Sequence, residues 1–200
     1  MLAAGIIFSV LALIFGGHAV ARQPAHARFH AERMELRAGY GWQYTNEVRP
    51  NNFQIIPVMP SAVIPLSESA GPSRAVFPSV LRGRWEWNPE LFLGGFQHPY
   101  LRPILGVTPL QFRYALTPKG RFTPYGLIGT GILYANVNRR ETRSDLNFNI
   151  QEGLGTYITL TPRTDLILEY RHIHISNAGV DEDNTGINAH TFLVGLSLKR

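Results

Sequence analysis

The sequence contains no cysteine and little charge. Among its 200 residues, 16% are Asp, Glu, Lys or Arg, whereas about 25% is usual for a globular domain. The absence of cysteine excludes disulfide scaffolds, thiol catalysis and zinc sites with cysteine ligands. The low charge content argues against a disordered chain and against a coiled coil held together by ion pairs. The length allows one domain or two small ones.

Long helical patterns are also missing. The chain has 19 glycines and 14 prolines, which would interrupt helices too often in a protein built of long helices. No segment after residue 32 keeps a 3.6-residue hydrophobic period. The formal net charge is +5 and the isoelectric point is about 9.8. A surface of this sign could contact nucleic acid or the acidic head groups of a membrane.

An apolar segment opens the chain. Residues 2–17 contain no charged side chain; this length suits a secretory signal better than a membrane helix, which needs roughly 20 residues. Ala19-Val20-Ala21 then offers a cleavage pattern of small residues. Because no Lys or Arg precedes the apolar run, an uncleaved anchor or a buried helix is the alternative. We predict a signal peptide at 1–21, an N-terminal extension at 22–32 and a folded domain at 33–200.

The folded domain alternates apolar and polar residues with a period of two, which is typical of strands. Met34, Leu36, Tyr40 and Trp42 share one parity, for example, and polar residues or glycines occupy the other. Prolines disturb the second predicted strand, and Pro89 is expected to end the third strand or to lie at a sheet edge. The alternation predicts eight strands, at 35–44, 53–66, 82–88, 102–116, 121–137, 147–160, 163–176 and 188–198.

Two barrel types fit this pattern. A transmembrane β-barrel faces lipid with its apolar residues and keeps polar residues inside, and its sheet must close because lipid cannot satisfy an open edge. In that arrangement the interior charges would pair with one another: Arg37, Arg84, Glu86, Arg113, Glu169 and Arg171. A soluble lipocalin-like carrier would invert the two faces and enclose a ligand cavity. We favour the all-β, eight-stranded, antiparallel transmembrane barrel, although Glu152 is expected on its lipid face.

The densest group of reactive side chains lies near the C-terminus. His174 and Ser176 share one face of a strand, so His174 can act as the base that activates Ser176 as a nucleophile. Backbone N–H groups of the following turn, Asn177-Ala178-Gly179, could stabilise an oxyanion. By spacing alone this pattern is weak evidence, since such residues also cap turns. His172, His174 and His190 also permit a metal site, but no acidic ligand is clearly placed with them.

The same segment resembles a known family. The motifs His174-Ile-Ser-Asn-Ala-Gly179 and Asn184-Thr-Gly-Ile-Asn188, with weaker matches at 84–90, 125–131 and 147–155, are similar to those of the outer-membrane lipid A 3-O-deacylases, also called acyloxyacyl-hydrolase-like proteins. The resemblance covers roughly residues 33–198. It implies an eight-stranded barrel that hydrolyses the ester-linked 3-hydroxyacyl chain at position 3 of lipid A.

The resemblance also assigns roles to residues. It implies Ser176 as the nucleophile and His174 as the base, while Asn188 stands where the family has the acid that orients the histidine. An amide can hold the imidazole but carries no charge, so a carboxylate of the next turn (Asp181, Glu182 or Asp183) is an alternative orienting group. A barrel that binds lipid with little or no turnover is the alternative function.

The resemblance further predicts the surroundings of the protein. It requires no cofactor or metal, and it implies lipid A or lipopolysaccharide as the partner rather than nucleic acid. The expected location is the outer membrane of a Gram-negative bacterium, after export by the signal peptide. A homodimer, a phospholipid substrate and the role of the proline-rich stretch at 57–74 stay open, and a pore is disfavoured because eight strands leave little lumen.

Overall fold

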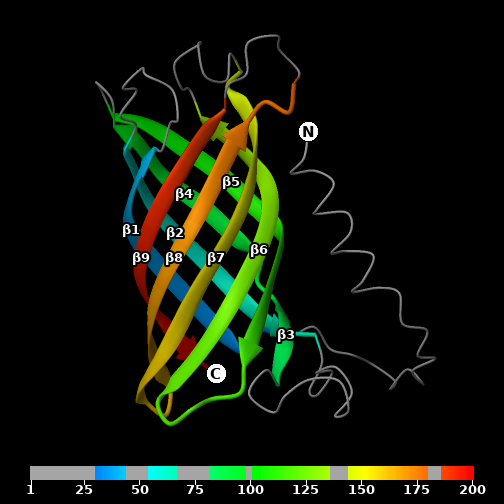
Figure 1. Ribbon diagram of the computed structural model, residues 1–200, viewed down its shortest axis with the longest axis vertical. Helices are drawn as coiled ribbons and strands as arrows, with labels where there is room; N and C mark the ends of the chain where they lie inside the picture. Colours follow the sequence, from blue (N-terminus) through cyan, green and yellow to red (C-terminus); the bar gives the residue numbers. More distant parts are fainter. Residues whose placement is uncertain (1–29, 44–53, 67–81, 98–100, 136–143, 180–185) are drawn as a thin grey trace, which may run out of the picture.

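The chain forms a β-barrel whose strands run in sequence order around the ring (Figure 1). The computed structural model describes residues 30–43, 54–66, 82–97, 101–135, 144–179 and 186–200, so the predicted signal peptide lies outside the described residues. The strands are β1 (Arg33–Gln43), β2 (Gln54–Pro65), β3 (Gly83–Trp87), β4 (Glu90–Gln97), β5 (Leu101–Leu116), β6 (Phe122–Ala135), β7 (Leu146–Thr161), β8 (Thr164–Ser176) and β9 (Ile187–Lys199). Within these ranges no helix is long and apolar enough to cross a bilayer.

The sheet closes on itself. Each strand pairs antiparallel with its neighbours, and β1 pairs with both β2 and β9. Two short segments, β3 and β4, share one place in the ring, because both lie between β2 and β5. The nine segments therefore occupy eight strand positions around the ring, which confirms the predicted eight-stranded antiparallel barrel. Among the described strands, closure of the ring leaves none without a partner on each side, as a membrane setting requires.

Pro89 interrupts a strand without ending it. The sequence prediction stopped at residue 88 and missed β4, which continues in the same place in the ring. Pro89 has no N–H to donate, but its neighbours bridge the gap. The Asn88 N–H donates to the Gln111 carbonyl at 2.8 Å, and the Ala62 N–H donates to the Pro89 carbonyl at 3.2 Å. The break is thus a local irregularity, of the kind found where proline occurs in sheets.

The apolar residues face outward. Leu36 and Leu154 are 53% and 69% exposed, whereas Arg37, Arg113 and Arg171 are fully buried. This orientation decides between the two barrels of the sequence analysis, because a lipocalin-like carrier would show the reverse. Exposed leucines, isoleucines and aromatic residues occur at every strand position around the barrel, which is the surface expected of a protein surrounded by lipid.

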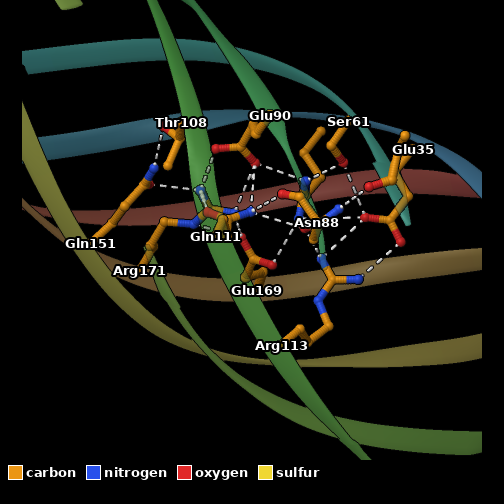
Figure 2. A network of polar contacts seen from close by, with 12 residues as sticks. Glu35, Ser61, Asn88, Glu90, Thr108, Gln111, Arg113, Gln151, Glu169 and Arg171 are labelled. Carbon is orange, nitrogen blue, oxygen red and sulfur yellow. Dashed lines mark hydrogen bonds and ion pairs between the residues drawn. The ribbon is translucent and has the colours of Figure 1, made fainter. Parts of the chain in front are cut away.

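Charged and amide side chains fill the middle of the barrel (Figure 2). Arg37 donates to Glu90 at 2.8 Å and to Glu169 at 3.2 Å. Arg171 bonds to both of these carboxylates as well, with 2.7 Å to Glu90. Each buried charge therefore has an opposite charge beside it, which is the condition for burying it at tolerable cost.

A second group continues this network toward the end of the barrel that holds the C-terminus. Arg113 donates to both Glu35 oxygens at 3.1 Å and to Asn88 Oδ1 at 2.7 Å. Glu86 accepts from Arg33 and Arg84. The predicted interior pairing of the charges is confirmed, and Glu35 and Glu90 are the partners that the sequence analysis did not assign.

Two apolar clusters fill the rest of the interior. The larger cluster includes Ile173, Ile175 and Ile187, which are fully buried at the end of the barrel where β8 passes to β9. The smaller cluster includes Tyr125 and Tyr157, whose hydroxyls donate to Glu169 and Glu35, so it lies among the charged side chains. The wall at the β8–β9 end is therefore backed by packed side chains, so groups on its outer surface are held on a rigid support.

Candidate active site

The predicted catalytic residues lie on the outer wall of the barrel, at the end where β8 ends and β9 begins. Ser176 is the last residue of β8, and Asn188 is the second residue of β9. His174 lies directly opposite Asn188 in the β8–β9 register. Inward-facing isoleucines alternate with these residues, so the strand pattern itself turns the polar side chains outward.

His174 and Asn188 are in contact. His174 Nδ1 lies 2.8 Å from Asn188 Oδ1. Because an amide oxygen can only accept, Nδ1 carries the proton and the other ring nitrogen, Nε2, is left as a base. Both side chains are half-buried. The amide thus selects the tautomer that a serine hydrolase needs, without adding a negative charge.

Ser176 lies beside His174 on the same face. Residues two apart on a strand point to the same side, and both residues are half-buried. Ser176 pairs with Phe148 of β7, which is exposed on the outer wall. The hydroxyl is therefore flanked by an apolar ring that could contact an acyl chain.

The turn after Ser176 has an unusual backbone. Ala178 and Gly179 both have positive φ values, 57° and 81°, and the Gly179 N–H donates to Asn177 Oδ1 at 2.9 Å. Asn177 itself is buried. The buried side chain of Asn177 thus fixes the turn, and an oxyanion would compete with Asn177 for the Gly179 N–H.

Gly186 is a site residue to which the sequence analysis gave no separate role. A Cβ at this position would lie 2.8 Å from His174 Cε1 and 3.5 Å from His174 Nε2, and the φ of Gly186 is +69°. The glycine thus lies against the edge of the ring that carries the proposed base. In the sequence, the only sign that Gly186 belongs to the site was its place two residues before Asn188, in the motif Asn184-Thr-Gly-Ile-Asn188.

A second row of polar groups lies next to the His174–Asn188 pair, farther from the end of β8. His172 of β8 pairs with His190 of β9 on one side and with Glu152 of β7 on the other. The Tyr170 hydroxyl lies 2.6 Å from His190 Nδ1, and His172 Nδ1 lies 3.6 Å from Glu152 Oε1. Glu152 does face outward, as the alternation predicted.

The remaining site predictions are the metal site and the alternative carboxylate that would orient His174. Among the described residues, no group of three or more His, Asp or Glu side chains is arranged to hold a metal ion. Asp181, Glu182 and Asp183 lie outside the described residues, so their suggested role in orienting His174 stays a prediction.

Comparison with known proteins gives a family match over most of the barrel. A model of the lipid A 3-O-deacylase (PagL) family matches residues 80–197, which confirms the resemblance seen in the motifs. No curated protein matches the chain significantly.

Solved structures show the same fold. The chain resembles the outer membrane enzyme PagL with a TM-score of 0.58 and 17% identity, over 82% of this chain and 97% of that chain. It resembles Neisserial surface protein A (NspA) with a TM-score of 0.51 and 11% identity, over 84% of this chain and 96% of that chain. Both likenesses concern the architecture of the barrel.

Proposed function

The chain belongs to the lipid A 3-O-deacylase family of ester hydrolases, and from this premise we propose that it removes the ester-linked 3-hydroxyacyl chain of lipid A with Ser176 as nucleophile and His174 as base. The observation that carries the proposal is the contact of 2.8 Å between His174 Nδ1 and Asn188 Oδ1 on the outer wall. This contact leaves His174 Nε2 available to accept a proton on the face that Ser176 shares.

The reaction proceeds in two halves. Ser176 Oγ attacks the acyl carbonyl carbon while His174 Nε2 takes its proton, and His174 then protonates the departing sugar oxygen. The products of the first half are an acyl ester on Ser176 and a free sugar hydroxyl. Water, deprotonated by His174, attacks this ester, and His174 returns the proton to Ser176 Oγ as the 3-hydroxy fatty acid departs. Backbone N–H groups of the turn at Asn177, Ala178 and Gly179 hold the negative oxygen in both halves, and the Gly179 N–H exchanges its bond to Asn177 Oδ1 for one to this oxygen.

The position of the site supports a lipid substrate. Ser176 and His174 face the surroundings of the barrel rather than its filled interior, so a substrate must approach through the membrane. Pro162 and Arg163 alone connect β7 to β8 at the opposite end. Short turns of such barrels face the periplasm, which would place Ser176 in the outer leaflet of the outer membrane, after export by the predicted signal peptide.

A direct test compares the release of fatty acid from lipid A by the refolded chain and by two variants. Ser176→Ala and His174→Ala should each lower the rate by at least 10³-fold, because either change removes the nucleophile–base unit. Phospholipid vesicles serve as the competing substrate and should release far less fatty acid. Undiminished release by folded Ser176→Ala would refute the mechanism.

The second candidate is a lipid-binding barrel with little turnover. One observation favours it, namely that the neutral Asn188 stands in contact with His174 where the family has an acid. This candidate predicts that the wild-type chain binds lipid A without cleaving it and that Asn188→Glu creates activity. The proposed function instead predicts measurable activity in the wild type. The identity of the fatty acid released in the same assays gives the preferred acyl chain, and the choice between a monomer and a homodimer needs a measurement of molecular mass in detergent.

A further inference from the structure

Glu152 is a charged residue on the outer, lipid-facing side of the barrel, where a charge is energetically unfavourable. It lies on the outer face of β7, between the exposed Ile150 and Leu154, and its side chain is 71% exposed to the surroundings of the barrel. A carboxylate on the lipid face of a barrel destabilises it to a degree that depends on depth. Ionisable residues in such positions usually mark functional sites.

The neighbours of Glu152 belong to the active-site wall. Its register partner on β8 is His172, and one diagonal neighbour on the same face is His174. Diagonal neighbours across an antiparallel pair are about 7–8 Å apart and within reach of long side chains. The carboxylate lies 3.6 Å from His172 Nδ1. Glu152 is thus held one residue pair away from the catalytic histidine.

The chemistry at His174 lacks a negative charge that Glu152 could supply. When Ser176 attacks, His174 becomes a cation, and its partner Asn188 can orient the ring but cannot offset this charge. The titratable side chains on the same outer face are Glu152 on β7, Tyr170, His172 and His174 on β8, and His190 on β9. Among these described groups Glu152 is the only carboxylate.

We propose that Glu152 is the electrostatic partner of His174 and supplies, from the neighbouring strand, the negative charge that Asn188 lacks. Orientation and charge, which a single acid usually provides together, are then divided between Asn188 and Glu152. Glu152 acts through His174 and does not touch the substrate, so it is a positioning residue. The inference rests on the proposed function of Ser176 and His174.

The expected effect follows from charge and distance. For unit charges about 8 Å apart at an effective dielectric constant of about 20, the attraction changes a rate by roughly 10- to 30-fold. Glu152→Gln should therefore lower kcat about tenfold and leave KM unchanged, because the charge on His174 develops only in the transition state. Glu152→Asp should retain most of the activity.

A charge reversal distinguishes this role from a structural one. Glu152→Lys places a positive charge at the same position, so it should lower kcat by roughly a further 10- to 30-fold below Glu152→Gln. Asp145→Asn is the matched control, since it removes an exposed carboxylate from the β6–β7 connection beside Tyr134. All variants are compared as full mature chains refolded in detergent, with heat-dependent mobility on gels to confirm that each barrel is folded.

The outcomes separate the two proposals. If Glu152→Gln keeps kcat within twofold of wild type, or if Glu152→Lys is as active as Glu152→Gln, the role of Glu152 is refuted while the mechanism at Ser176 stands. An inactive wild-type chain would also refute the role of Glu152, because Glu152 would then not replace the acid that is missing at position 188. Activity in Ser176→Ala would refute the proposed function itself, whatever Glu152 does.

Discussion

At the residue scale, the contact between His174 and Asn188 decides how this site can work. In a serine protease, an amide in place of the acid lowers kcat about 10⁴-fold because the imidazole takes the wrong tautomer. Here Asn188 presents its oxygen to Nδ1 at 2.8 Å, so the useful tautomer is retained. The remaining deficit is electrostatic, which is a smaller penalty than a wrong tautomer.

Substitutions at Asn188 should separate orientation from charge. Asn188→Leu removes the acceptor and should lower kcat about 100-fold, whereas Asn188→Glu restores a carboxylate and should raise kcat about tenfold. The kcat of each variant is measured as the rate at which 3-hydroxy fatty acid is released at saturating lipid A. If Asn188→Leu were as active as the wild type, Asn188 would have no part in orienting His174.

Gly186 offers a second test at this scale. A methyl group there would lie 2.8 Å from His174 Cε1, so Gly186→Ala should displace the imidazole and lower kcat at least tenfold. Gly120→Ala is the matched control, because Gly120 also has a positive φ, +62°, but has no atoms within 4 Å of the added methyl. Equal activity in the two variants would show that Gly186 does not constrain the histidine.

At the scale of the strands, alternation predicted which residues face outward, and the structure confirms this for β1, β5 and β8. The reason is geometric, since side chains on a strand must alternate between two faces. The location of β4 could not be predicted, because Pro89 reads as a terminator when the neighbouring strand is unknown. The partners of the interior charges were also out of reach, since they depend on register between strands distant in sequence.

For the site, the sequence supplied the residues but not their contacts. The pairing of His174 with Asn188 follows from the β8–β9 register, which the intervening turn does not reveal. The proximity of Glu152 to His172 likewise depends on the β7–β8 register. Gly186 could be interpreted only after the structure placed it against the imidazole ring.

The charged layer inside the barrel gives a prediction about stability. Arg113 is fully buried and donates to Glu35 and Asn88, so Arg113→Met leaves the Glu35 carboxylate short of its main partner. The cost should be about 3–5 kcal/mol, measured as a loss in the free energy of unfolding of the detergent-refolded barrel. Lys119→Met at an exposed turn should change it by less than about 0.5 kcal/mol, and equal losses would contradict the role of the network.

At the scale of the whole molecule, the barrel is filled by its own side chains and carries the proposed site on its outer wall. Charged and amide side chains occupy the middle (Figure 2), and two apolar clusters pack with them. A barrel of eight strands has an interior just wide enough for its own side chains. We expect liposomes that contain the protein to exclude small sugars in a swelling assay. Rapid swelling would show that the barrel is a pore.

The central claim is that this barrel is a lipid A ester hydrolase with Ser176 as its nucleophile. Mass spectrometry of lipid A after incubation with the refolded mature chain, beside a folded Ser176→Ala control, tests it most directly. The account predicts the loss of one 3-hydroxyacyl group with the wild type only. No loss with a folded wild-type barrel, or the same loss with Ser176→Ala, would contradict the account.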